Sequence, residues 1–124
     1  METDKPRVLV VDDQIVVRQV LKVILQQANF IVVGEATNGE RALDLCDQLR
    51  PDLICLDIFM PRKDGIEVLE QARMEYPETR VVMISGESKS AKVKEALALG
   101  AHGFIIKPFK PAQVLSTLRE AMDR

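Results

Sequence analysis

Residues 53–57 read Leu-Ile-Cys-Leu-Asp, an unbroken apolar run that ends in a carboxylate. A short continuous apolar run without polar alternation is typical of a strand buried on both faces of a parallel sheet. Four further runs of this kind occur along the chain, at 8–11, 30–33, 81–84 and 104–106. The sequence therefore predicts five buried strands, with 53–56 as the third.

The segments between these runs show helical periodicity. In the first, apolar side chains recur three and four residues apart, at Val17, Val20, Leu21, Ile24, Leu25 and Ala28. Similar stripes are found within 42–49, 66–69, 93–100 and 115–122, with Asn38 as a plausible N-cap and Pro111 in a first turn. Strands alternating with helices predict an α/β fold, a three-layer αβα sandwich around a five-stranded parallel sheet with five helices. Its expected strand order is the flavodoxin-like 2-1-3-4-5.

Composition narrows the class of protein. The chain has 124 residues, 47% of them hydrophobic, and a net charge of −2, which suits one globular domain over residues 1–124. Nothing in the charge favours direct nucleic-acid binding. No run is apolar and long enough to span a membrane, so we expect a cytoplasmic protein. Cys46 and Cys55 have no metal-type spacing and are interpreted as reduced core residues.

Polar residues follow four of the five predicted strands. Asp12 and Asp13 follow the first, Asp57 the third, Ser85 the fourth and Lys107 the fifth. Because the strands are parallel, these residues should meet at the carboxyl edge of the sheet, where ligands bind in open α/β folds. The second strand, which this order places at the border, ends in Glu35-Ala36-Thr37 instead.

The predicted edge carries more negative than positive charge. Two carboxylates about 4 Å apart repel by roughly 4 kcal/mol at an effective dielectric near 20. Lys107 supplies one positive charge, and oxygen ligands select a hard dication such as Mg²⁺ for the remainder. Each residue alone is commonly a turn or cap residue, so the joint placement carries the prediction. His102 is the only histidine, which excludes a Cys/His zinc site and favours a surface or loop role.

Four separated motifs resemble one known family across essentially the whole chain. They are Val-Val-Asp12-Asp13, Leu56-Asp57-Ile-Phe-Met-Pro61 followed by Asp64-Gly65, Ile84-Ser85-Gly86, and Lys107-Pro108-Phe109. These motifs are similar to those of the response regulator receiver domain, the CheY-like superfamily of two-component signal transduction. The departures are small, with Ser85 in place of the commoner Thr and Gly86 in place of Ala.

The resemblance implies a role for each matched residue. Asp57 is expected to accept a phosphoryl group from a phosphohistidine on a sensor histidine kinase or phosphotransfer protein. Asp13 and Asp57 would ligate Mg²⁺ directly, Asp12 through water, and Phe59 through its backbone carbonyl. Lys107, after which the peptide bond to Pro108 would be cis, would pair with the phosphoryl oxygens, and Ser85 would hydrogen-bond them. The domain is then a signalling switch rather than an enzyme.

The resemblance also implies an output. Ser85 would move toward the phosphate and Phe104 would turn inward, although a plain core role for Phe104 is equally compatible with the sequence. The changed face would comprise the fourth helix, the fifth strand and the fifth helix. On it, Lys89, Lys92 and Lys94 would contact a downstream effector or a fused output domain. Alternatively, these lysines are simply the solvated face of the fourth helix. A monomer or a phosphorylation-dependent dimer would fit. The sequence leaves open whether this is a stand-alone regulator or part of a longer one.

Positions 59 and 87 tune dephosphorylation in the family, and bulky Phe59 is expected to prolong the phosphorylated lifetime.

Three alternative functions fit the sequence less well. A haloacid-dehalogenase-type phosphatase needs an acid two residues after its nucleophile, where this chain has Phe59. An FMN or nucleotide module needs a phosphate-binding loop after the first strand, where Asp12 and Asp13 stand instead. A docking module without phosphorylation would not need the complete acid, hydroxyl and lysine set.

Overall fold

The computed structural model describes residues 5–86 and 91–123. Strands and helices alternate along the chain. The strands are β1 (Arg7–Val11), β2 (Ile31–Ala36), β3 (Leu53–Asp57), β4 (Arg80–Ser85) and β5 (Gly103–Ile106). The helices are α1 (Ile15–Gln27), α2 (Gly39–Leu49), α3 (Gly65–Glu75), α4 (Ala91–Ala98) and α5 (Pro111–Met122). The predicted element order is therefore confirmed.

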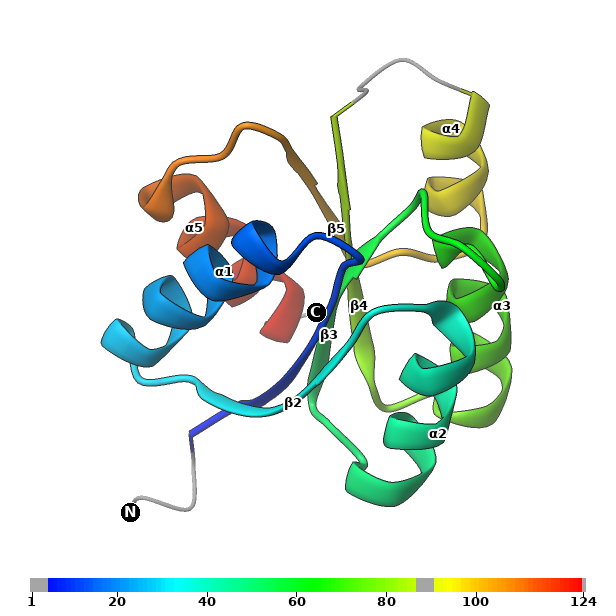
Figure 1. Cartoon of the computed structure of the whole chain (residues 1–124), viewed down its shortest axis with the longest axis horizontal. Coiled ribbons are helices and arrows are strands. Elements are labelled where there is room, and N and C mark those ends of the chain that lie inside the picture. The colour runs from blue at the N-terminus through cyan, green and yellow to red at the C-terminus, as the bar shows by residue number, and fades with distance from the viewer. Residues whose placement is uncertain (1–4, 87–90, 124) are drawn as a thin grey trace.

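The strands form one parallel sheet of order β2-β1-β3-β4-β5, as predicted. Helices α1 and α5 cover one face of this sheet, and α2, α3 and α4 cover the other (Figure 1). Alternate residues of the central strands point into two separate apolar cores, one under each helical layer. The three-layer sandwich follows from this, because β1, β3 and β4 must bury both of their faces.

The two outer strands depart from the prediction of full burial. Ile31 in β2 remains 41% exposed, and most of β5 is only partly buried. An edge strand has one neighbour instead of two, so the helices cover it incompletely. Strand β2 also runs further than the predicted 30–33, through Glu35 to Ala36, with a register shift opposite Val8 and Leu9.

Helix α1 shows the clearest difference from the predicted stripe. Leu21, Ile24 and Leu25 are buried as expected, whereas Val20 is 44% exposed. Val20 instead lines a surface groove that it shares with Phe109 and with Pro111 at the start of α5. The capping predictions are confirmed. The Asn38 side chain accepts a hydrogen bond from the Arg41 amide at 2.9 Å, and Pro111 begins α5.

Both cysteines are buried free thiols, as the sequence suggested. His102 lies in the loop before β5, where its Nδ1 accepts a hydrogen bond from the Val81 amide at 3.1 Å. Over residues 5–86 and 91–123, the structure contains no helix with the length and apolar character needed to cross a membrane.

Candidate functional site

The register of the sheet brings the polar strand ends together. Val11 pairs with Leu56, Asp57 pairs with Ile84, and Ser85 pairs with Ile106. Each next residue along β1 and β5, Asp12 and Lys107, therefore lies at the same carboxyl edge as Asp57 and Ser85. The predicted convergence is observed.

Two carboxylates, one directly after β1 and one at the end of β3, lie beside the Lys107 ammonium. Its Nζ lies 2.9 Å from Asp12 Oδ2 and 3.7 Å from Asp57 Oδ1. One carboxylate oxygen from each of Asp12, Asp13 and Asp57 lies within 4.8 Å of the others. Asp12 and Asp57 are buried, whereas Asp13 faces solvent. The cluster has one lysine for three acids, and its all-oxygen donor set is compatible with a hard metal ion. The Lys107–Pro108 peptide bond is cis, as the resemblance implied.

The electrostatics of Asp57 follow from its position. Burial is the main cause that raises its pKa from 3.8 to about 6, and the Asp12 charge adds to it. Lys107 and a hydrogen bond from the Phe59 amide act in the opposite direction. The carboxyl is therefore mostly ionised at neutral pH, yet it is held in an environment that disfavours its negative charge. Such a group is a strong candidate for a functional role.

The raised pKa predicts a pH dependence of stability in metal-free protein. Between about pH 4 and pH 6 the folded state holds a proton on Asp57 that the unfolded state has released, so stability falls as pH rises. Asp57→Asn removes this effect. We expect its stability advantage over wild type to grow across that window to about 3 kcal/mol and then stay constant, since one pKa unit is about 1.4 kcal/mol. Urea denaturation of both proteins in EDTA measures the difference, and a difference that is constant from pH 4 to pH 8 would refute the assigned burial effect.

The chain after Asp57 is packed tightly against α3. A Cβ built on Gly65 would lie 2.2 Å from the Asp57 carbonyl oxygen and 2.8 Å from Ile58 Cα. Asp64 caps the helix and forms a capping box with Glu67. The absence of a side chain at residue 65 therefore lets the start of α3 approach the end of β3 and fixes the loop after Asp57.

Gly65→Ala is expected to destabilise the protein by about 2 kcal/mol, because the new methyl group must displace main chain rather than a flexible side chain. Gly86→Ala is a matched control at the same edge of the sheet. A Cβ there meets nothing within 4 Å, so its effect should stay within about 0.5 kcal/mol. Chemical denaturation measures both, and equal effects would show that the close contact at Gly65 is unimportant.

The other predicted site residues have mixed placements. Ser85 is 1% exposed at the end of β4, and Phe104 is partly buried against the core under α2, α3 and α4. The backbone amide of Phe59 donates a hydrogen bond to Asp57, and the residue as a whole is 46% exposed. Lys92 pairs with Asp64 at 2.8 Å. Glu87 and Lys89 lie outside the described residues.

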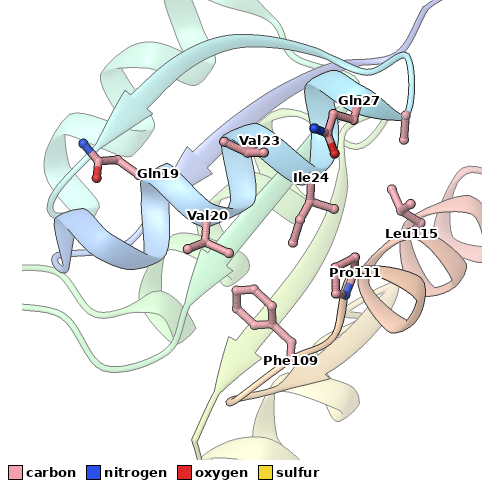
Figure 2. A pocket seen from close by; sticks show the side chains of 9 residues that line it. Gln19, Val20, Val23, Ile24, Gln27, Phe109, Pro111 and Leu115 are labelled. Carbon is pink, nitrogen blue, oxygen red and sulfur yellow. The ribbon is translucent and has the colours of Figure 1, made fainter.

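An apolar groove adjoins the site on the α1 side. It has a volume of about 470 Å³ and is lined mainly by α1, Phe109 and the start of α5. Figure 2 shows Val20, Ile24 and Phe109 directed into it. A second depression, which Val16 and Val20 share with Lys107 and Phe109, extends toward the acidic cluster. The sequence placed Val20 in the apolar stripe of this helix and gave no sign that part of the stripe would remain exposed.

The α/β fold with an acidic cluster at the carboxyl edge of its sheet is typical of one family of signalling domains, and comparison of the sequence with known families gives the same result. Residues 8–119 match the response regulator receiver domain, and the chain belongs to this family of two-component signalling domains. It is 39% identical over 114 residues to the chemotaxis protein CheY of Thermotoga maritima, which covers 92% of this chain and 95% of that protein. It is 44% identical over 116 residues to a Bacillus subtilis protein named CcdB, covering 94% and 97% of the two chains.

Solved structures agree with this assignment. The response regulator domain of Thermotoga maritima CheB is 38% identical and superposes with a TM-score of 0.89 over 97% of this chain and 98% of that one. A Borrelia burgdorferi chain from a complex described as CheX-CheY-BeF3-Mg is 35% identical, with a TM-score of 0.88 over 94% and 90%. The predicted CheY-like fold is thereby confirmed.

Proposed function

We propose that this receiver domain accepts a phosphoryl group on Asp57 from a phosphohistidine of a sensor kinase or phosphotransfer protein, with Mg²⁺ bound at the acidic cluster. The observation that carries the proposal is the cluster of Asp12, Asp13 and Asp57 carboxylates, two of which, Asp12 and Asp57, lie beside the Lys107 ammonium. The BeF3 and Mg²⁺ named in the Borrelia burgdorferi complex give independent support from a relative.

The residues present fit Mg²⁺. The cluster holds three carboxylates and one ammonium, so it retains negative charge that a dication would compensate. Mg²⁺ favours a few carboxylates together with water and phosphate oxygens. In the proposed arrangement Asp13 and Asp57 ligate it directly, Asp12 does so through water, and the Phe59 carbonyl is a further ligand. When bound, the ion neutralises charge on the transferring phosphoryl oxygens.

In the proposed reaction an Asp57 carboxylate oxygen attacks phosphorus. A new P–O bond forms, the P–N bond to the donor imidazole breaks, and the imidazole keeps the bonding electron pair. Asp57 needs no general base, because it is ionised above about pH 6. Lys107 lies close enough to Asp57 to pair with the incoming oxygens. Positioning and charge compensation are the main requirements of such a transfer.

The proposed switch begins with the new acceptor oxygens on Asp57. The Ser85 hydroxyl would donate to one of them, and Phe104 on the neighbouring strand would respond by turning inward. Phosphorylation adds roughly −1.5 to −2 charges, which is sufficient to reorganise nearby contacts. The face of α4, β5 and α5, including Lys92 and Lys94, would then bind an effector protein or fused output domain, as a monomer or a phosphorylation-dependent dimer. No direct nucleic-acid contact is proposed for this domain.

The apolar surface of α1 supports a protein as the phosphodonor. Ile15, Val16, Val20 and Val23 are each more than 40% exposed, and they begin two residues after Asp13. Exposed apolar patches of this kind commonly mark protein contacts. A donor resting on this surface would have its histidine beside the carboxyl edge of the sheet, where Asp57 is located.

The proposal is tested by incubating the protein with labelled acetyl phosphate, with either excess Mg²⁺ or EDTA. Acetyl phosphate replaces the unidentified kinase, so the result depends on this chain alone. We expect label that requires Mg²⁺ and that is lost in alkali and in hydroxylamine, as for an acyl phosphate. Absence of label under both conditions, or equal labelling in EDTA, would contradict the proposed chemistry.

Phe59→Asn is expected to shorten the phosphorylated lifetime severalfold. The aromatic ring would hinder water from approaching the acyl phosphate in line, whereas asparagine is smaller and can hydrogen-bond water. Loss of label after removal of acetyl phosphate measures the rate. Phe59→Leu, which keeps an apolar side chain, is the control and should retain a lifetime closer to that of wild type. An unchanged or longer lifetime for Phe59→Asn would count against this role.

A further inference from the structure

Every backbone and carboxylate polar group of Asp12 is held by a different part of the fold. Its amide donates to the Ala36 carbonyl at 3.1 Å, and its two carboxylate oxygens accept from the Gln14 amide and Lys107 Nζ, each at 2.9 Å. Its backbone carbonyl accepts from Arg18 Nη1 at 2.8 Å. The contact to Ala36 belongs to the sheet, the contact to Gln14 to the following loop, and the contact to Lys107 to the acidic cluster. The contact from Arg18 belongs to none of these, and Arg18 was not among the predicted site residues.

Arg18 reaches this carbonyl from the first turns of α1 and is itself anchored. Its Nε lies 3.0 Å from Glu35 Oε1, and its side chain is only 12% exposed. Lys22 holds the other Glu35 oxygen at 2.8 Å, and this hydrogen bond is the main reason that the pKa of Glu35 lies below its ordinary value. Glu35 therefore stays ionised and keeps the Arg18 guanidinium fixed above β2.

Asp13 has no comparable support of its own. It is exposed, and among residues 5–86 and 91–123 no hydrogen bond or ion pair holds its side chain. Its position is thus set by the backbone of the β1–α1 loop, and the peptide group that joins it to Asp12 is the one whose carbonyl Arg18 binds. The helix does not supply an alternative anchor, because Gln14 at its N-cap makes no side-chain capping bond.

We propose that Arg18, held in place by Glu35, is a positioning residue that fixes the Asp12–Asp13 peptide and so presets the Asp13 carboxylate for metal binding. The role rests on the proposed function, since it concerns the same metal site. The proposal also gives a role to β2, which holds Glu35 and is the one strand whose end carries no predicted site residue. Residues that orient metal ligands from outside the site commonly change metal affinity when they are replaced.

A purely structural explanation is that the ion pairs only tie α1 to β2. Lys22 separates the two explanations, because it binds the same Glu35 at 2.8 Å, against 3.0 Å for Arg18, but within the described residues it forms no hydrogen bond or ion pair with Asp12. Lys22→Gln should therefore weaken the tie without altering the metal site. Arg18→Gln removes both the tie and the contact to the Asp12 carbonyl.

The test is the Mg²⁺ dependence of thermal unfolding, which reports binding without any phosphorylation. Melting temperatures of wild type, Arg18→Gln, Lys22→Gln and Glu35→Gln are measured over a series of MgCl₂ concentrations, with NaCl adjusted to hold ionic strength constant. We expect the dissociation constant for Mg²⁺ to rise about tenfold in Arg18→Gln, at the lower end of the effect of such residues. Lys22→Gln should stay within about twofold of wild type, and Glu35→Gln should fall between them.

Equal Mg²⁺ affinity in wild type and Arg18→Gln would overturn the inference, as would an equal loss in Lys22→Gln. If wild type itself shows no Mg²⁺-dependent stabilisation, the proposed metal site fails and this role fails with it. Arg18→Lys keeps the charge but cannot donate in two directions from one planar group. It provides a second variant if Arg18→Gln does not fold. For Arg18→Lys we expect a rise in the Mg²⁺ dissociation constant that is smaller than the rise for Arg18→Gln.

Discussion

Asp57→Asn is expected to incorporate no phosphoryl group from acetyl phosphate, whereas wild type is labelled in Mg²⁺. The amide lacks the ionised oxygen that attacks phosphorus, and it ligates a dication more weakly than a carboxylate. The fold should persist, because Asn has nearly the same shape and removes a buried charge whose pKa is raised to about 6. Measuring both labelling and folding of Asp57→Asn therefore separates loss of the phosphoryl acceptor from loss of the folded structure.

Asp44→Asn is the control for this experiment. Asp44 is exposed on α2, outside the acidic cluster, and its replacement should leave labelling unchanged. Circular dichroism of both variants establishes that they are folded. Labelling of Asp57→Asn at the wild-type level would show that another residue is the acceptor.

Lys107→Met is expected to destabilise the metal-free protein by about 3 kcal/mol, a typical cost of removing one partner of a buried ion pair. Lys107 bonds to Asp12, whose side chain is 0% exposed, and it lies within 3.7 Å of the Asp57 carboxylate. Without the ammonium these two carboxylates repel each other in a site from which water is largely excluded. The free energy of unfolding in EDTA, from urea titration, measures the loss.

Two comparisons sharpen this prediction. Lys94→Met, at an exposed position of α4, should change stability by less than about 0.5 kcal/mol. Added Mg²⁺ should recover more stability in Lys107→Met than in wild type, because the dication would then be the only positive charge beside the carboxylates. A Lys107→Met protein as stable as wild type in EDTA would show that the lysine does not compensate the acidic cluster.

The sequence predicted the convergence of these polar residues at one edge of the sheet, because each of them is tied to the end of a strand. Asp12, Asp57, Ser85 and Lys107 each end or follow a short apolar run, and parallel pairing brings such positions to one edge whatever the details of the helices. Their meeting therefore depends only on strand order and register. Hydrophobic patterning and the handedness of crossovers predicted a parallel sheet, the flavodoxin-like fold supplied the expected order, and the register came from the structure.

Other features depend on packing that no local pattern encodes. Val20 belongs to the apolar stripe of α1, yet it lines a surface groove opposite Phe109 and the start of α5 instead of being buried. The link from Glu35 through Arg18 to Asp12 requires knowing that β2 continues to Ala36 and that Arg18 points across it. The need for glycine at residue 65 arises from its approach to the Asp57 carbonyl, which only the tertiary structure reveals.

The central claim is that Asp57 is the residue that carries the phosphoryl group. Reduction with borohydride converts an aspartyl phosphate into homoserine, which a mass measurement on proteolytic peptides locates. After treatment with acetyl phosphate and Mg²⁺, we predict homoserine at residue 57, and none when EDTA replaces Mg²⁺. Homoserine at another aspartate with residue 57 unmodified, or unreduced label on a serine or histidine, would contradict the account.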